Sequence, residues 1–340
     1  MKVILETLLS GKDLSPEQTR ESFQALMRGT LSEAQQAAFL VALRAKGESP
    51  QEIAVAAQVL REFAQPVAAP AGAVDTCGTG GDGSGTLNFS TAAAIVTASL
   101  GVSVAKHGNR SVSSRCGSAD VIEAMGWPLT LSPRACQLLL EEKGFAFLFA
   151  PALHPAMKVV APVRRALGVR TIFNLLGPLA NPAGVKRQVV GAFSPRAMEL
   201  LAFALAELGA EYAWVVHSRD GLDELSSSAP TDVVEVREGK VIRRLVVDPA
   251  QLGLEFGEDR ALQGADAQDN ARRLWAILEG REEGPTAGAV ALATGAALLV
   301  AGRVSHLRDG VCQARQALSS GVAANFFRGV LKRAQELTDA

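Results

Sequence analysis

Val74-Asp75-Thr76-Cys77-Gly78-Thr79-Gly80-Gly81-Asp82-Gly83-Ser84-Gly85-Thr86, followed by Asn88-Phe89-Ser90-Thr91 and an alanine-rich run, is the stretch that decides the fold. A short apolar strand leads into five glycines, which can adopt positive φ and expose backbone N–H groups, and hydroxyl groups follow at the start of a helix. This pattern predicts a phosphate-binding turn between a strand and a helix. Asp82 lies among the donors and would repel a bare phosphate, so we expect a divalent metal or a ribose hydroxyl as its counterpart.

The composition is that of an ordinary globular protein. The chain has 340 residues, of which 48% are hydrophobic, and this length predicts about two domains. Its 34 basic and 35 acidic side chains give a net charge of -1, so the charge does not favour nucleic acid as a partner. The four cysteines have no CxxC spacing, which is typical of a protein in a reducing, cytoplasmic setting.

Two stretches bear on membrane association. The N-terminal residues Met1–Glu6 interrupt an apolar run with a glutamate, so we do not expect a signal peptide. Residues 286–302 are uncharged, but they fall short of the roughly 20 residues needed to cross a bilayer and are rich in Gly and Ala. We therefore expect a close-packed buried helix there and no membrane partner.

Three helix starts are visible in the first 65 residues. Each has a serine at the N-cap and Glu or Gln three residues later, and two also have a proline at the first helical position: Ser15 to Gln18, Ser32 to Gln35 and Ser49 to Glu52. The stretch Pro66–Gly72 lacks periodicity and carries two prolines, as linkers do. The sequence therefore predicts a small all-helical domain over residues 1–70.

Beyond the linker, short apolar runs alternate with helical patterns such as Pro195–Gly209. This alternation is typical of an α/β domain with a mainly parallel central sheet, and we expect it to fill residues 71–340. The order of the strands cannot be read from the pattern. The expected strands, besides the one before the glycine run, are Gly101–Ala105, Phe145–Ala150, Gln188–Phe193, Glu211–His217 and Thr231–Arg237.

A second polar segment, Lys106–Ser114, follows the strand expected to end at Ala105. It concentrates a lysine, an arginine, amides and hydroxyls in nine residues, which are the groups that a diphosphate needs at the C-terminal edge of a parallel strand. The alternative is a solvated polar loop. His107 taken alone would more often be a structural histidine than a catalytic one.

A third segment, Asp220–Ser226, presents carboxylates after a strand that ends near His217. Adjacent acids on a loop are most often exposed charge. Magnesium, however, is usually bound by one or two carboxylates together with substrate phosphates. In a chain that already carries a phosphate-binding turn, we therefore interpret the carboxylates of this segment as ligands of Mg²⁺.

A fourth segment, Arg164–Pro182, mixes arginines with apolar residues and prolines. Composition alone favours a surface helix with one buried face. An arginine beside an apolar wall also suits an aromatic carboxylate, because the acid gains a bidentate partner and the ring a dry surface.

Together these segments, with His154-Pro155-Ala156-Met157-Lys158, resemble the anthranilate phosphoribosyltransferase family of tryptophan biosynthesis, in order and over most of the chain. The resemblance implies transfer of the 5-phosphoribosyl group from phosphoribosyl diphosphate to the amine of anthranilate, the second committed step of that pathway. Diphosphate is released and Mg²⁺ is required. It further implies a homodimer formed through the helical domain, on which we expect residues 160–185 to pack.

The resemblance also assigns site residues. Ser90, Asp223 and Glu224 would bind the metal, and Asn109, His107, Arg164 and the Gly177–Pro178 wall would line the path of anthranilate. Phosphoribosyl diphosphate would be bound by a larger set: Gly78, Thr79, Gly81, Asp82, Thr86, Asn88, Ser90, Thr91, Lys106, His107, Gly108, Asn109, Arg110, Ser111, Val112, Ser113, Ser114 and Ser118.

This inventory needs no dedicated catalytic residue. Breaking the bond at C1 of the ribose separates a diphosphate from a sugar with oxocarbenium character, so stabilising the leaving group and positioning the amine supply the catalysis. The aromatic amine is neutral at pH 7, and a strong general base is therefore optional.

Two alternatives stay open at this stage. A pyrimidine nucleoside phosphorylase resembles this family in fold, but such chains carry a further C-terminal domain and a Lys-His-Ser loop, whereas Lys106-His107 precede Gly108 here. Phosphorolysis of thymidine or uridine would identify it. A non-enzymatic relative that binds nucleic acid should be basic, and salt-dependent binding to single-stranded DNA would identify that protein.

Overall fold

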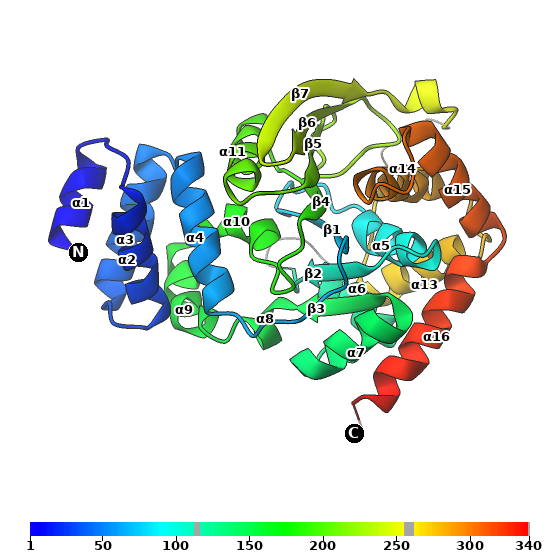
Figure 1. Ribbon diagram of the computed structural model, residues 1–340, viewed down its shortest axis with the longest axis horizontal. Helices are drawn as coiled ribbons and strands as arrows, with labels where there is room; N and C mark the ends of the chain where they lie inside the picture. Colours follow the sequence, from blue (N-terminus) through cyan, green and yellow to red (C-terminus); the bar gives the residue numbers. More distant parts are fainter. Residues whose placement is uncertain (112–115, 255–261, 339–340) are drawn as a thin grey trace.

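The computed structural model describes residues 1–111, 116–254 and 262–338. At the end of the molecule that carries the N-terminus, the chain forms α1 (Lys2–Leu9), α2 (Pro16–Met27), α3 (Glu33–Lys46) and α4 (Pro50–Glu62) (Figure 1). The three predicted capping boxes are confirmed: Ser15, Ser32 and Ser49 each accept a hydrogen bond from the N3 backbone, and the N3 side chain bonds back to the N-cap. Local sequence therefore fixes where α2, α3 and α4 begin.

The rest of the chain is built on a seven-stranded sheet in the order β3-β2-β1-β4-β5-β6-β7. The five strands from β3 to β5 are parallel, while β6 pairs antiparallel with both β5 and β7, so the predicted mainly parallel α/β architecture is confirmed. The strands are β1 (Val74–Gly78), β2 (Val104–Gly108), β3 (Phe145–Phe149), β4 (Arg187–Gly191), β5 (Tyr212–Ser218), β6 (Thr231–Arg237) and β7 (Lys240–Val247).

Two strand expectations were wrong. The strand expected at Gly101–Ala105 is β2, which begins three residues later because Gly101 forms a turn with φ of 83°. It also ends three residues later, so Lys106 and His107 belong to a buried strand and not to a loop. The second error is β7, which was not expected because exposed Lys and Arg residues interrupt its apolar pattern at the edge of the sheet.

Helices cover both faces of the sheet (Figure 1). One of them, α14, is buried over nearly its whole length, as expected for the uncharged run near residue 290. Among the described residues, no helix combines the length and the apolar character needed to cross a membrane. The remaining elements are α5 (Phe89–Ser99), α6 (Ser118–Ala124), α7 (Pro133–Lys143), α8 (Ala150–Leu153), α9 (Met157–Leu167), α10 (Phe173–Leu176), α11 (Pro195–Glu207), α13 (Ala267–Leu278), α14 (Pro285–Val300), α15 (Leu307–Ser319), α16 (Val322–Glu336) and two 3-10 turns, η1 (Gly177–Leu179) and η2 (Pro249–Leu252).

Alternate residues of the central strands enter two different apolar clusters. In β5, Trp214 and Val216 join a cluster with α5, α14 and the C-terminal helices, whereas Ala213 and Val215 join the opposite one. That second cluster also contains the N-terminal helices, α9, α10 and α11. The helical end of the molecule therefore shares its core with one face of the sheet, and α9 packs against α2 and α3.

Candidate active site

The glycine run forms a turn at the C-terminal edge of β1, as predicted. Gly80, Gly81, Gly83 and Gly85 all have positive φ between 62° and 78°, a conformation that other residues rarely adopt. The run ends at Asn88, where α5 begins, so the helix N-terminus adds a favourable dipole beside the turn. The local geometry is that of an anion-binding turn.

Contacts from two other segments hold this turn in place. The backbone N–H of Thr79 donates to the carbonyl of Gly191 at the end of β4 (2.9 Å), and the hydroxyl of Thr79 accepts from the N–H of Phe193 (3.0 Å). The N–H of Gly80 donates to Oδ2 of Asp223 (2.6 Å) in the connection after β5. Residues far apart in the chain therefore meet at one edge of the sheet.

In the Asp220–Ser226 segment, Asp220 is exposed, but Asp223 and Glu224 are buried or half-buried. Asp223 is buried, and its own N–H donates to Oδ2 of Asp82 at 3.3 Å. Burial and the neighbouring Asp82 raise the pKa of Asp223. Burial and Asp223 raise the pKa of Glu224 to about 8, although the nearby Lys106 acts in the opposite direction. Oε2 of Glu224 is buried and has no hydrogen-bond partner.

A divalent cation fits this group of carboxylates. Asp82 raises the pKa of Asp223, and Asp223 raises that of Glu224, one of whose oxygens has no partner. A positive charge placed among these acids would stabilise their ionised forms. Among the described residues, no three His, Cys, Asp or Glu side chains are arranged to enclose a metal. Such a cation would therefore need oxygens from a bound ligand, which is how Mg²⁺ is held beside substrate phosphates.

Lys106 lies beneath the turn and not in a loop beside it. Its side chain is 1% exposed, and its Nζ donates to the carbonyl of Thr76 in β1. The ammonium group lowers the pKa of both Asp75 and Glu224, against the effect of burial. The structure thus gives Lys106 a role in balancing buried charge, and its predicted contact with phosphoribosyl diphosphate stays a prediction.

His107 is buried and neutral. Burial and the neighbouring His154, whose ring lies 5.2 Å away, lower the pKa of His107 to about 3. Burial likewise lowers the pKa of His154 to about 4. Nδ1 of His107 lies 3.1 Å from the carbonyl of Gly177, and Nε2 is buried without a partner. The pair therefore offers a neutral surface beside the Gly177–Pro178 wall.

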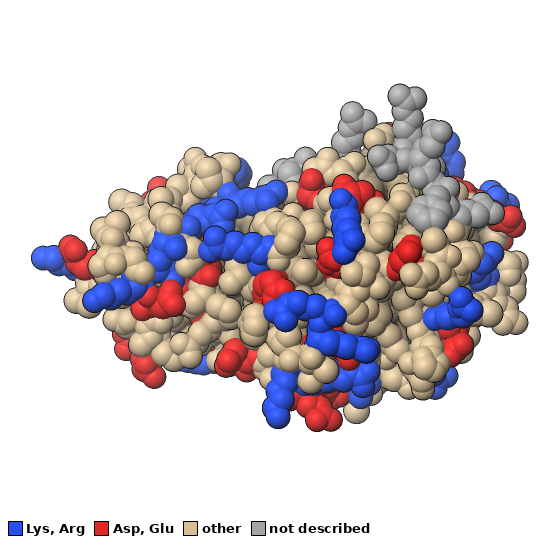
Figure 2. Space-filling view, turned by 90° about the horizontal axis from the view of Figure 1, so that it is seen from above, with Lys and Arg blue, Asp and Glu red and all other residues tan. Residues whose placement is uncertain are grey.

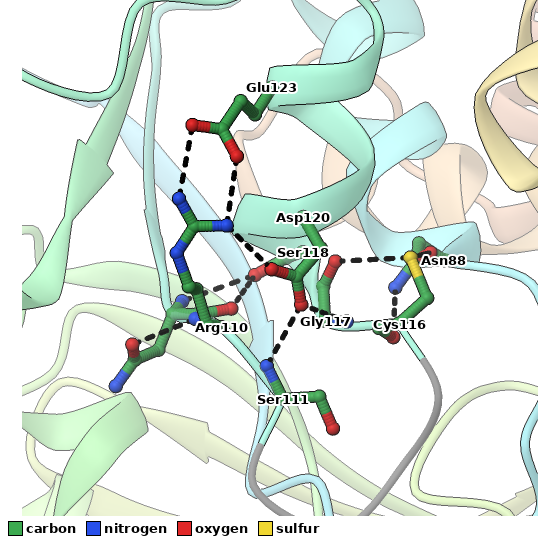
Figure 3. A network of polar contacts seen from close by, with 9 residues as sticks. Asn88, Arg110, Ser111, Cys116, Gly117, Ser118, Asp120 and Glu123 are labelled. Atoms are coloured by element: carbon green, nitrogen blue, oxygen red, sulfur yellow. Dashed lines mark hydrogen bonds and ion pairs between the residues drawn. The ribbon is translucent and has the colours of Figure 1, made fainter. Parts of the chain in front are cut away.

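The segment after β2 is organised by Asp120 of α6 (Figure 3). The carboxylate of Asp120 accepts from the N–H groups of Ser111 (3.1 Å) and Gly117 (2.8 Å) and pairs with Arg110 (2.8 Å). Glu123 pairs with the same guanidinium at 2.8 Å. Arg110, which is predicted to bind phosphoribosyl diphosphate, thus forms ion pairs with two acids in this structure. The predicted site residues Val112, Ser113 and Ser114 lie outside the described residues.

The other predicted polar residues surround the start of α5. The hydroxyl of Thr86 lies 3.3 Å from that of Ser84, and the amide of Asn88 donates to the carbonyl of Cys116 (3.3 Å). Thr91 Oγ1 is buried without a partner, while the carbonyl of Ser90 accepts from the hydroxyl of Thr76 (3.0 Å). After β2, the hydroxyl of Ser118 accepts from the N–H of Asn109 (3.2 Å), and Gly108 leaves no room for a Cβ beside Phe147 and Ser118.

The predicted arginine and apolar wall lie where the helical end meets the sheet. Arg164 of α9 has its guanidinium carbon 4.9 Å from the centroid of the Phe173 ring, and burial lowers its pKa. No carboxylate pairs with Arg164 in the described part of the chain. Figure 2 shows a band of Lys and Arg side chains running from the helical end toward the α/β body. An unpaired, partly buried arginine in this position suits a carboxylate ligand.

Hydrogen bonds from three other elements to the carbonyl groups of η1 hold the Gly177–Pro178 wall in place. Those of Pro178 and Leu179 accept from Gln188 of β4 (2.9 Å) and from Arg61 of α4 (2.6 Å). That of Gly177 accepts from His107 of β2 when His107 carries its proton on Nδ1. Because each partner comes from a different element, the wall keeps its place only when the helical end and the sheet are correctly packed.

Sequence reasoning missed two residues at this site. Arg170 donates from Nη2 to the carbonyl of Gly81, and Gly191 of β4 faces Asp223 so closely that a Cβ there would overlap the carbonyl oxygen of Asp223. No local signal identifies either contact, because the partners lie far apart in sequence. The sequence offers only an indirect signal, because Arg170 lies in the Arg164–Pro182 segment and Gly191 in the expected strand Gln188–Phe193.

Two glycine substitutions should have different effects. A Cβ at Gly191 overlaps backbone, so Gly191→Ala is expected to lower the free energy of unfolding by about 3 kcal/mol. A Cβ at Gly78 would lie 2.7 Å from Oδ2 of Asp223, a movable side-chain atom, so Gly78→Ala should displace the carboxylate and lower activity with less than about 1 kcal/mol of destabilisation. Chemical denaturation measures both.

Gly329→Ala is the matched control, because it lies within α16 with open space around the new methyl group and should be neutral or slightly stabilising. Equal destabilisation of the Gly78 and Gly191 variants would contradict this description of Asp223.

Comparisons with known proteins agree with this geometry. Residues 2–64 match the model of the glycosyl transferase family, helical bundle domain, and residues 71–324 match that of the glycosyl transferase family, a/b domain. The anthranilate phosphoribosyltransferase of Methylobacterium sp. (strain 4-46) is 47% identical over 100% of this chain and 99% of its own length. That of Thermus thermophilus superposes with a TM-score of 0.92 at 45% identity, covering 98% of this chain and 99% of the other.

The enzyme from Saccharomyces cerevisiae has been solved in complex with PRPP and Mg, and it superposes with a TM-score of 0.91 at 26% identity, covering 98% of each chain. These relatives support the resemblance seen in the sequence and neither of its alternatives. The chain belongs to the anthranilate phosphoribosyltransferase family of glycosyltransferases.

Proposed function

We propose that this enzyme transfers the 5-phosphoribosyl group of phosphoribosyl diphosphate to the amine of anthranilate with the help of Mg²⁺. The observation that carries the proposal is the hydrogen bond of the buried Asp223 to the glycine turn, with the unpartnered oxygen of Glu224 beside it, because this arrangement suits a metal-bound diphosphate. The yeast relative in complex with PRPP and Mg supports it.

In this reaction the bond between C1 of the ribose and the diphosphate oxygen breaks, and a bond forms between C1 and the anthranilate nitrogen. The nitrogen loses one proton, and diphosphate leaves with the electron pair of the broken bond. Mg²⁺ would supply charge that stabilises the leaving diphosphate. The N–H groups of the turn would bind its oxygens, and the dipole of α5 would favour its negative charge, so that both are in place when charge develops.

The acceptor would bind against the other wall of the site. Arg164 is the expected partner of the anthranilate carboxylate, and the Gly177–Pro178 wall would contact the ring. The neutral His107 and His154 would line this path without repelling an aromatic ring or attracting a second anion. The solved yeast relative in complex with 4-fluoroanthranilate supports an acceptor of this class.

Fluorescence tests the function directly. Anthranilate fluorescence should fall only when phosphoribosyl diphosphate and Mg²⁺ are both present, and diphosphate should appear in equal amount. Loss of signal without diphosphate, or phosphorolysis of thymidine by the same preparation, would overturn the proposal.

The metal requirement should depend on pH. The pKa of Glu224 is raised to about 8, and the metal needs the ionised carboxylate, so protons compete with it below that value. We expect the apparent affinity for Mg²⁺ to rise by up to about 100-fold between roughly pH 6 and pH 9. Activity titrated with Mg²⁺ across this range measures it. The substrate's own phosphates contribute part of this pH dependence of Mg²⁺ affinity in both proteins, and Glu224→Gln should remove the rest. If Mg²⁺ affinity depends on pH equally in the wild type and in Glu224→Gln, Glu224 does not bind the metal.

We also propose that the enzyme is a cytoplasmic homodimer formed through the helical domain, without a nucleic-acid or membrane partner. In this proposal the helical domain ends near residue 70, and residues 160–185 pack on it. Three exposed apolar side chains support the interface: Val3 (69% exposed) and Leu9 (74%) of α1, and Val41 (45%) of α3, the helix that contacts α1. Val41→Lys should convert a dimer to a monomer in light scattering. An unchanged mass would move the interface elsewhere.

A further inference from the structure

Arg170 occupies the short connection between α9 and α10, in the same segment as Arg164. Gly168 ends α9 with φ of 62°, and Ile172 is buried in the apolar cluster that the N-terminal helices share with the sheet. The backbone on both sides of Arg170 is therefore anchored to the helical end. Its side chain is exposed and reaches away from that anchor, toward the glycine turn.

Two contacts fix the guanidinium of Arg170. Nη2 donates to the carbonyl of Gly81, and the guanidinium carbon lies 4.2 Å from the centroid of the Phe193 ring. The backbone N–H of Phe193 in turn donates to the hydroxyl of Thr79 (3.0 Å). Arg170 thus contacts the turn directly at Gly81 and indirectly at Thr79.

The opposite side of the turn is held by Asp223. Its Oδ2 accepts from the N–H of Gly80 at 2.6 Å, and its N–H donates to the carboxylate of Asp82 at 3.3 Å. Consecutive residues of the turn are therefore bound alternately from the two sides of the site. A turn rich in glycine loses much backbone entropy when it becomes ordered, so each external contact contributes to its shape.

We propose that Arg170 is a positioning residue for phosphoribosyl diphosphate, which holds the glycine turn in the conformation that presents its N–H groups to the ligand. This inference deepens the proposed function and rests on it for the identity of the ligand. The remaining nitrogens of the guanidinium have no acceptor in the described parts of the chain, while Nη2 already lies at the turn. The cation therefore also favours a phosphate bound there.

Three variants test this role: Arg170→Ala, Arg170→Lys and, as the matched control, Arg165→Ala. Arg165 is a neighbouring exposed arginine of α9 without an ion pair in the described part of the chain. Hydrogen exchange of the ligand-free protein is measured first. Amides of residues 79–85 should exchange about tenfold faster in Arg170→Ala than in Arg165→Ala, while the rest of the sheet is unchanged.

Steady-state kinetics then supply the second readout. Arg170→Ala should raise KM for phosphoribosyl diphosphate about tenfold, because one charge-assisted hydrogen bond is lost. KM for anthranilate should change less than about twofold. Arg170→Lys should recover part of the difference, because its ammonium retains the charge and a single donor.

Unchanged exchange in the turn, or equal increases of both KM values, would overturn the positioning role. If the wild-type protein fails to consume anthranilate, the proposed function is wrong, while the exchange experiment still decides whether Arg170 holds the turn.

Discussion

Asp223→Asn combined with Glu224→Gln is expected to lower kcat/KM at limiting Mg²⁺ by about 100-fold or more, because leaving-group stabilisation of this kind contributes several kcal/mol. Part of the loss should be recovered at high Mg²⁺, since the substrate's own phosphates still bind the metal. Titration of activity with Mg²⁺ measures both effects. Glu207→Gln on α11 is the control, because this exposed acid lies outside the site and its removal changes the net charge by one unit.

The same double variant should stabilise the metal-free protein. A carboxyl group whose pKa is higher in the folded state binds its proton more tightly there, so its contribution to stability falls as pH rises from the unfolded pKa toward the folded one. For Glu224 this interval runs from its ordinary value of 4.5 to about 8. At about pH 8 the variant should therefore have a higher Tm than the wild type in the presence of a chelator. An unchanged metal requirement, with or without this change in Tm, would assign both acids a structural role.

Arg164→Ala should act on the acceptor alone. The guanidinium lies against the Phe173 ring without a carboxylate partner among the described residues. Its removal should therefore weaken the binding free energy of anthranilate by about 2 to 3 kcal/mol. We expect kcat/KM for anthranilate to fall by about 30- to 100-fold, and KM for phosphoribosyl diphosphate to change by less than about threefold.

Arg165→Ala, one residue along α9, is the matched control and should leave both constants unchanged, because its exposed side chain points elsewhere on the helix. Comparable losses for the two substrates in Arg164→Ala would show that this arginine supports the fold of the site and does not bind the acid.

Local features of the sequence predicted much of this structure. The capping boxes at Ser15, Ser32 and Ser49 depend on groups three residues apart, and the glycine turn depends on backbone conformations that its own residues allow. The mainly parallel sheet followed from the alternation of short apolar runs with helices. These parts could be predicted because each is determined within a short window of the chain.

The remainder depends on partners that are distant in sequence. Lys106 and His107 look like loop residues because they are polar, yet they are buried in β2 by contacts with Thr76 and Gly177, which lie 30 and 70 residues away. The contact between Arg170 and Gly81 spans 89 residues. The sequence predicts Asp223 and Glu224 as metal ligands, and that assignment stays a prediction. Their burial, which raises their pKa values, is visible only in the folded chain.

The central claim is transfer of the ribosyl carbon from diphosphate to the anthranilate nitrogen, and isotope labelling follows that carbon directly. Phosphoribosyl diphosphate labelled with ¹³C at C1 is incubated with the enzyme, ¹⁵N-anthranilate and Mg²⁺, and the products are observed by NMR. The account predicts a new one-bond coupling between the labelled carbon and nitrogen, with one diphosphate released per coupling formed, and neither signal when Mg²⁺ is chelated. Release of labelled ribose 5-phosphate with the anthranilate left unchanged would contradict it.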